Sequence, residues 1–122
     1  MDGNFPTFLN ANAVMETIFT KIIRREIPAK IVYEDDLSLA FLDIAPKAPV
    51  HVLIIPKKSI ESLEDVQPED LPIIAHLFSV VKKVAEIKGV AESGYRIVIN
   101  CGKEGGQEVP HLHLHLLGGK QL

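Results

Sequence analysis

The chain has 122 residues, enough for one domain with a single hydrophobic core. Hydrophobic residues make up 47% of it and charged residues 24%, which is typical of a soluble globular protein. The net charge of -3 argues against a protein that binds duplex nucleic acid or a membrane surface, and no apolar run is long enough to span a bilayer.

We expect residues 1–12 to form a flexible extension and residues 13–122 a single domain. A first helix is predicted over 13–25, where Phe19, Ile22 and Ile23 lie in an apolar stripe at helical spacing. Pro28 stops this helix. Three short strands are then predicted over 31–34, 39–43 and 51–55.

A second, longer helix is predicted to begin near Pro68, which an opening turn tolerates, and to end at Gly89. Strands over 95–100 and 111–117 follow and form a hairpin around a glycine-rich loop, 101–108. Short strands beside two separate helices predict an α+β domain with an antiparallel meander sheet of about five strands. The single cysteine, Cys101, excludes an internal disulfide and favours a reducing, cytoplasmic environment.

The string HLHLHLL at 111–117 is the most informative feature of the sequence. Successive side chains of a strand point to opposite faces, so His111, His113 and His115 are predicted to share one face. Leu112, Leu114 and Leu116 share the other. Alternate residues lie about 6.5 Å apart along a strand, so the histidines form a compact polar row.

Two kinds of chemistry fit such a row. One is a zinc site, and the other is catalysis in which one imidazole attacks and another moves a proton. The flanking residues favour catalysis, because Gly105, Gly106 and Gln107 can offer backbone N–H groups to a phosphate and Asn100 adds an amide donor. The sequence offers no carboxylate or thiolate at metal-ligand spacing beside the histidines, so no metal site is predicted.

At these residues the sequence resembles the histidine triad family, whose signature is His-x-His-x-His followed by two hydrophobic residues. The segments IFTKIIRREIPAKIVYEDD, LAFLDIAPKAPVHVLIIPKK and GGQEVPHLHLHLLGG are similar to segments of its Hint branch, the histidine triad nucleotide-binding proteins. The resemblance extends over about residues 17–121, nearly the whole chain.

The resemblance implies the fold of that family and a homodimer in which the two sheets join. It also implies hydrolysis of purine nucleoside phosphoramidates or acyl nucleotidylates to the nucleoside monophosphate, such as AMP or GMP, with no cofactor. His113 would be the nucleophile, oriented by the backbone carbonyl of His111. His115 would bind a phosphate oxygen and assist the leaving group, and His51 would support His111.

The resemblance also assigns the nucleotide-binding residues. Asp43 and Ile44 would hold the ribose. An apolar slot for the purine and a set of groups around the phosphate complete the site: Ile18, Phe19, Ile22 and Phe41 for the purine, and Asn100, Gly106, Gln107 and Glu108 for the phosphate.

Glu108 stands where animal Hint proteins carry a serine that contacts the leaving group. A carboxylate repels phosphate unless it turns away or is protonated, so we expect mainly the backbone of Glu108 to contribute. This departure leaves a nucleotide-binding or scaffolding protein with little turnover as the alternative function, with a zinc-binding protein as a third.

Overall fold

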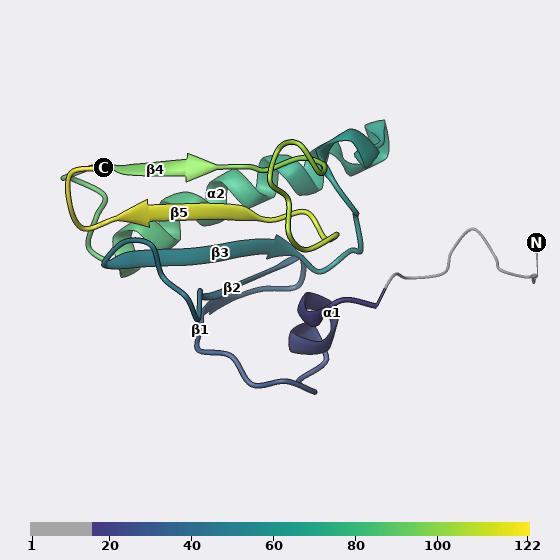
Figure 1. Ribbon diagram of the computed structural model, residues 1–122, viewed down its shortest axis with the longest axis horizontal. Coiled ribbons are helices and arrows are strands. Elements are labelled where there is room, and N and C mark those ends of the chain that lie inside the picture. Colours follow the sequence, from purple (N-terminus) through teal and green to yellow (C-terminus); the bar gives the residue numbers. More distant parts are fainter. Residues whose placement is uncertain (1–15) are drawn as a thin grey trace, which may run out of the picture.

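The computed structural model describes residues 16–122 as an antiparallel five-stranded sheet with helices on both faces (Figure 1). The strands are β1 (Ile31–Glu34), β2 (Ser38–Leu42), β3 (Val50–Pro56), β4 (Tyr95–Val98) and β5 (Leu114–Gly118). The helices are α1 (Ile18–Ile23) and α2 (Leu71–Ile87), with short 3₁₀ turns η1 (Leu63–Asp65) and η2 (Pro68–Asp70) before α2. Among residues 16–122, no helix has the length and apolar character needed to cross a lipid bilayer.

The predicted α+β class, the antiparallel sheet and the two helices are confirmed. The strand order is β1-β2-β3-β5-β4, so the sheet departs from a meander at one point. The 17-residue α2, about 25 Å long, crosses one face of the sheet (Figure 1). After α2 the chain forms β4 at the edge of the sheet. Strand β5 then pairs with both β4 and β3 and lies between them.

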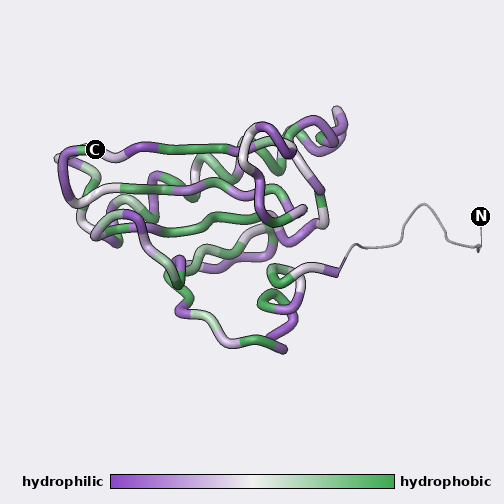
Figure 2. Tube along the Cα trace, in the orientation of Figure 1, coloured by the Kyte–Doolittle hydropathy of each residue, from purple (hydrophilic) through white to green (hydrophobic). Residues whose placement is uncertain are grey.

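The two faces of the sheet bury different residues. On the α2 face, Val52, Ile54, Leu114 and Leu116 pack with the buried residues of the helix and form the main core. On the α1 face, a smaller cluster contains Phe19, Ile22, Leu39, Phe41, Leu53 and Ile55. The central strand β3 is therefore buried on both faces, and Figure 2 shows its hydrophobic character.

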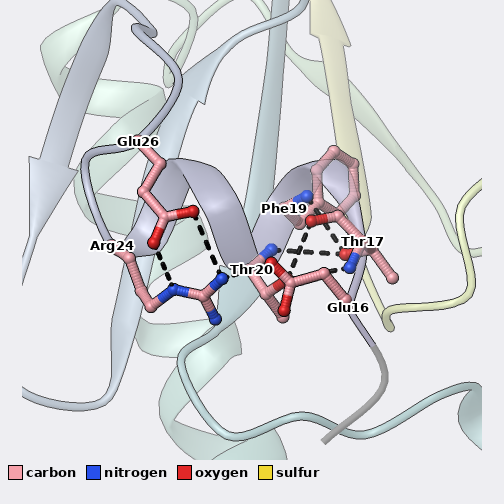
Figure 3. A network of polar contacts seen from close by, with 6 residues as sticks. All are labelled: Glu16, Thr17, Phe19, Thr20, Arg24 and Glu26. Carbon is pink, nitrogen blue, oxygen red and sulfur yellow. Dashed lines mark hydrogen bonds and ion pairs between the residues drawn. The ribbon is translucent and has the colours of Figure 1, made fainter.

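Helix α1 is shorter than predicted. Residues 1–15, which include the predicted extension and the predicted helix start, lie outside the described residues. Within them the helix starts at Ile18 because Thr17 caps it: the Thr17 hydroxyl accepts hydrogen bonds from the amides of Phe19 (3.1 Å) and Thr20 (3.2 Å), and the Thr20 hydroxyl accepts one from the Thr17 amide (Figure 3). It ends at Ile23, two residues early, and Arg25 takes a left-handed conformation with φ of 63°.

The last strand also begins later than predicted, at Leu114 rather than His111. The His111 amide donates to the carbonyl of Val109 (2.8 Å) and the Leu112 amide donates to that of Ile60 (2.7 Å). These bonds turn residues 111–113 away from the ladder before β5 pairs with β3. Only His115 of the three histidines therefore sits in the sheet.

The turn between β1 and β2 is tied to α2 by the carboxylate of Asp35. One oxygen accepts from the amides of Leu37 and Ser38 and from the Ser38 hydroxyl, and the other accepts from Tyr33 and from Nε2 of His76 (2.7 Å). Burial by itself raises the pKa of this carboxyl, but the combined hydrogen bonds outweigh burial and hold the pKa well below its usual range.

A carboxyl with a lowered native pKa stabilises the fold above its unfolded pKa, near about 4, and loses that effect as pH falls through the native value. We expect Asp35→Asn to lower the free energy of unfolding by about 2 kcal/mol at pH 7, and the deficit to shrink at pH 3. Urea denaturation at both pH values measures this, with the exposed neighbour Asp36→Asn as the control. A deficit of equal size at both pH values would contradict the assignment.

Candidate active site

A cavity of about 620 Å³ opens on the α1 face of the sheet. It brings together nearly all the residues that the sequence predicted for the site, from both ends of the chain. Those lining it are Ile18, Phe19, Ile22, Phe41, Asp43, Ile44, His51, Asn100, Gly106, Glu108, His113 and His115. Of the predicted residues, His111 and Gln107 do not line it.

The wall of the cavity combines apolar side chains with histidines. The Phe19 ring lies edge-on to Phe41, with ring centroids 5.5 Å apart, and edge-on to His113 at 5.1 Å. Ile44 is 92% exposed and Ile18 45% exposed, at the mouth. Apolar side chains left in solvent beside a cavity mark a surface that a ligand can cover.

His113 is 5% exposed and has one fixed ring nitrogen. Its Nδ1 lies 2.7 Å from the backbone carbonyl of His111. A carbonyl only accepts, so Nδ1 carries the proton and Nε2 of the neutral ring keeps its lone pair. The nitrogen left without a proton is the nucleophilic one.

His111 is completely buried, contrary to the prediction that all three histidines share one polar face. Its Nε2 donates to the carbonyl of Pro56 (2.8 Å), while Nδ1 has no partner among residues 16–122. Burial lowers the pKa of His111 and favours its neutral form. It acts on the cavity only indirectly, through its backbone carbonyl, which accepts from Nδ1 of His113.

His51 contacts His115, and not His111 as predicted. The register explains the difference: β3 pairs Leu53 with His115 and His51 with Leu117, so the two histidines lie diagonally on one face. Nε2 of His51 is 3.0 Å from Nδ1 of His115, and Nδ1 of His51 accepts from the Lys47 amide (3.1 Å). Burial, with the neighbouring His113 and His51, lowers the pKa of His115 to about 4.

Two backbone amides of the glycine-rich loop donate hydrogen bonds to carbonyls of the same loop rather than toward the cavity. The amides of Gly106 and Gln107 bond to the carbonyls of Lys103 and Gly102, so two donors of the predicted phosphate cradle are occupied. A Cβ at Gly105 would lie 2.3 Å from the carbonyl oxygen of Cys101, so only glycine fits there. The amide of Glu108 has no partner within residues 16–122.

Gln107 does not line the cavity in which the phosphate is predicted to bind. Its side-chain amide donates to the carbonyls of Glu61 (2.8 Å) and Val109 (2.9 Å), and its Oε1 accepts from the Gly102 amide. It lines a neighbouring cavity of about 490 Å³ and holds the loop in place. The Asn100 side chain donates to the Gly105 carbonyl (2.8 Å) and does line the first cavity.

A carboxylate stands closer to the histidines than the sequence predicted. Asp43, His51 and His115 offer ligand atoms within 4.8 Å of one another, the one such group within residues 16–122. However, the Lys47 amide donates to Nδ1 of His51, which leaves the His51 proton on Nε2, the atom that would face a metal. The hydrogen-bond pattern thus favours a proton-bearing site over a metal site.

Comparisons with known proteins agree with this geometry. The family model of the HIT domain matches residues 24–122. A purine nucleoside phosphoramidase of Escherichia coli K12 is 54% identical over 107 residues, covering 88% of this chain and 90% of that protein.

Solved structures are similar over the same region. A HIT family hydrolase of Legionella pneumophila has a TM-score of 0.84 at 51% identity, covering 87% of this chain and 95% of that one. A histidine triad protein of Clostridium difficile has a TM-score of 0.86 at 48% identity, covering 90% and 96%. By its domain match, its relatives and its histidine-lined cavity, the chain belongs to the histidine triad (HIT) family.

Proposed function

We propose that this protein hydrolyses purine nucleoside phosphoramidates, and acyl nucleotidylates, through a nucleotidyl intermediate on His113. The hydrogen bond from Nδ1 of His113 to the carbonyl of His111 carries the proposal, because it leaves a lone pair on Nε2 at a cavity of nucleotide size. The phosphoramidase relative at 54% identity supports the substrate class.

The reaction proceeds in two displacements. Nε2 of His113 attacks the α-phosphorus, the P–N bond breaks, and the amine leaves with the electron pair and takes up a proton. Water then attacks the phosphorus, the P–Nε2 bond breaks, and the nucleoside monophosphate is released. The ring of His113 is cationic in the intermediate, so its bond to the His111 carbonyl strengthens as the charge develops.

The nucleotide lies across the cavity in this proposal. The purine lies against the apolar wall of the cavity, which includes Phe19 and Phe41 in edge-to-face contact with each other. Asp43 binds the ribose hydroxyls, and its carboxylate is already oriented by the Ala45 amide (2.7 Å). The phosphate lies beside Asn100 and Gly106 and accepts a hydrogen bond from the backbone amide of Glu108.

The direct test is to incubate the purified protein with adenosine 5'-phosphoramidate and follow AMP by chromatography. We expect catalytic release of AMP. No release from adenosine and guanosine phosphoramidates or from acyl adenylates would overturn the proposal. Tight AMP binding without turnover would then identify the binding-only alternative.

We further propose a homodimer formed along β4 and one flank of α2. On the other flank of α2, His76 and Lys83 contact Asp35 and Tyr33, close to β1. Helical geometry places Leu71 (58% exposed) and Phe78 (45% exposed) on the opposite flank, toward the edge strand β4. An edge strand beside exposed apolar side chains suits an interface between two copies.

We expect Phe78→Glu to convert the dimer to a monomer at micromolar concentration, because the substitution buries a charge at the interface. Sedimentation velocity measures the change. The control is Lys30→Glu, an exposed residue just before β1, which is at the opposite edge of the sheet from β4. A dimer that persists in Phe78→Glu, or a monomeric wild type, would contradict this assembly.

A further inference from the structure

The proton positions in the His51–His115 pair are set by a backbone amide. The N–H of Lys47 donates to Nδ1 of His51 at 3.1 Å, and its direction is fixed by the peptide plane. An acceptor nitrogen carries no proton, so the proton of neutral His51 is on Nε2. Nε2 therefore donates to Nδ1 of His115 at 3.0 Å, and the proton of His115 is on its own Nε2.

The same geometry leaves no place for an additional proton on the pair. Nδ1 of His51 is occupied by the Lys47 amide, and the gap between the rings already holds one proton. Among the charged or titratable groups around the pair, Asp43 stabilises a positive charge on the rings, because its carboxylate lies 3.5 Å from Nε2 of His51. A positive charge is disfavoured by burial of the rings and by the nearby Lys47 and His113. The pKa values of both rings are therefore lowered.

We propose that the Lys47 amide, acting through His51, holds His115 as a neutral hydrogen-bond donor to the phosphoryl oxygens and not as the acid that protonates the leaving group. This inference rests on the proposed hydrolysis and refines the part that the family resemblance implies for His115. A neutral imidazole that released its Nε2 proton would become an imidazolate, so His115 keeps that proton throughout. The leaving nitrogen takes its proton from water, and the water that attacks the phosphorus in the second displacement releases the matching proton.

The contribution of His115 is then electrostatic. A donor aimed at oxygens that gain charge in the transition state is worth about 10²–10³-fold in rate. Keeping an imidazole neutral so that it donates without transferring its proton is a known use of a lowered pKa. Lys47 and His51 are positioning residues in this arrangement, because they act only through His115.

A series of adenosine phosphoramidates with amines of graded basicity tests the proposal. We expect His115→Ala to lower kcat/KM about 100-fold or more, and by the same factor for every leaving group. His115→Gln keeps a neutral donor that has no acid function, so we expect it to recover about tenfold over His115→Ala. A loss that grows with the basicity of the amine, or a His115→Gln as impaired as His115→Ala, would show that His115 is the acid.

The role of the Lys47 amide is tested by comparing two variants. Lys47→Pro removes the amide N–H, and Lys47→Ala keeps it and removes only the ammonium. We expect kcat to be at least about tenfold lower in Lys47→Pro than in Lys47→Ala. We also expect a new loss of kcat at acidic pH in Lys47→Pro, because Nδ1 of His51 becomes free to take a proton. Equal kcat values and equal pH profiles in the two variants would show that the Lys47 amide does not fix the proton positions of His51 and His115. If Lys47→Pro fails to fold, the leaving-group series still decides the role of His115. A His113→Ala variant that remains active would instead refute the proposed hydrolysis.

Discussion

His113→Ala is expected to lower kcat for phosphoramidate hydrolysis by at least about 10⁴-fold, because the variant has no nitrogen to accept the nucleotidyl group. The ring of His111 is completely buried and its Nε2 donates to the Pro56 carbonyl, and His115 presents a proton rather than a lone pair to the cavity. Neither neighbour can therefore replace the missing nucleophile. Steady-state assays with adenosine 5'-phosphoramidate measure the loss.

The matched control is His76→Ala, which removes the histidine that contacts Asp35 on the other face of the molecule. We expect that variant to keep its kcat while it loses some stability. Thermal unfolding checks that His113→Ala remains folded. Hydrolysis by folded His113→Ala at more than about 1% of the wild-type rate would rule out His113 as the nucleophile.

Leu114→Ala is expected to produce the largest loss of stability, about 2–5 kcal/mol in the free energy of unfolding. Leu114 is 1% exposed and lies in the core between β5 and α2, where a cavity cannot collapse easily. The cost combines lost burial with the cavity left behind. Urea denaturation at pH 7 measures it.

Leu63→Ala provides the comparison, because Leu63 is 43% exposed in η1, and there we expect a change of about 0.5 kcal/mol or less. The specific activity of the folded Leu114→Ala fraction should stay close to that of the wild type, since Leu114 faces away from the cavity. A loss below about 1 kcal/mol for Leu114→Ala would contradict its place in the core.

These two substitutions probe the two faces of one short segment, and that division was predictable from the sequence. The alternation in HLHLHLL predicted that leucines and histidines point in opposite directions, and Leu114 and Leu116 do pack under α2 while His115 faces the cavity. Local patterns also predicted the five strands and both helices. These features depend on side-chain period and on nearby proline and glycine, which are local properties of the chain.

Features that depend on strand register and on loop hydrogen bonds could not be predicted in the same way. The alternation places His111 beside His113, but the bonds of residues 111 and 112 to Val109 and Ile60 bury its ring. Whether His51 meets His111 or His115 is decided by how β3 pairs with β5. The spacing of residues in the sequence does not determine how β3 pairs with β5 or where the carbonyl of Ile60 lies.

The glycine loop and Asp43 illustrate the same limit. Gln107 follows two glycines and was predicted to bind phosphate, yet its amide closes the loop onto the Glu61 carbonyl. Asp43 is far in sequence from His111, His113 and His115, and the antiparallel pairing of β2 with β3 brings it 3.5 Å from His51, which contacts His115. The partners of both side chains depend on contacts between separate segments of the chain, which the sequence does not contain.

The stereochemical course at phosphorus tests the central claim, the nucleotidyl intermediate on His113, most directly. A phosphorothioamidate of adenosine with a single configuration at phosphorus would be hydrolysed in ¹⁸O-labelled water, and the configuration of the labelled product determined. Two in-line displacements, the first by Nε2 of His113 and the second by water, predict net retention. Net inversion would show that water attacks the substrate directly, and would contradict the account.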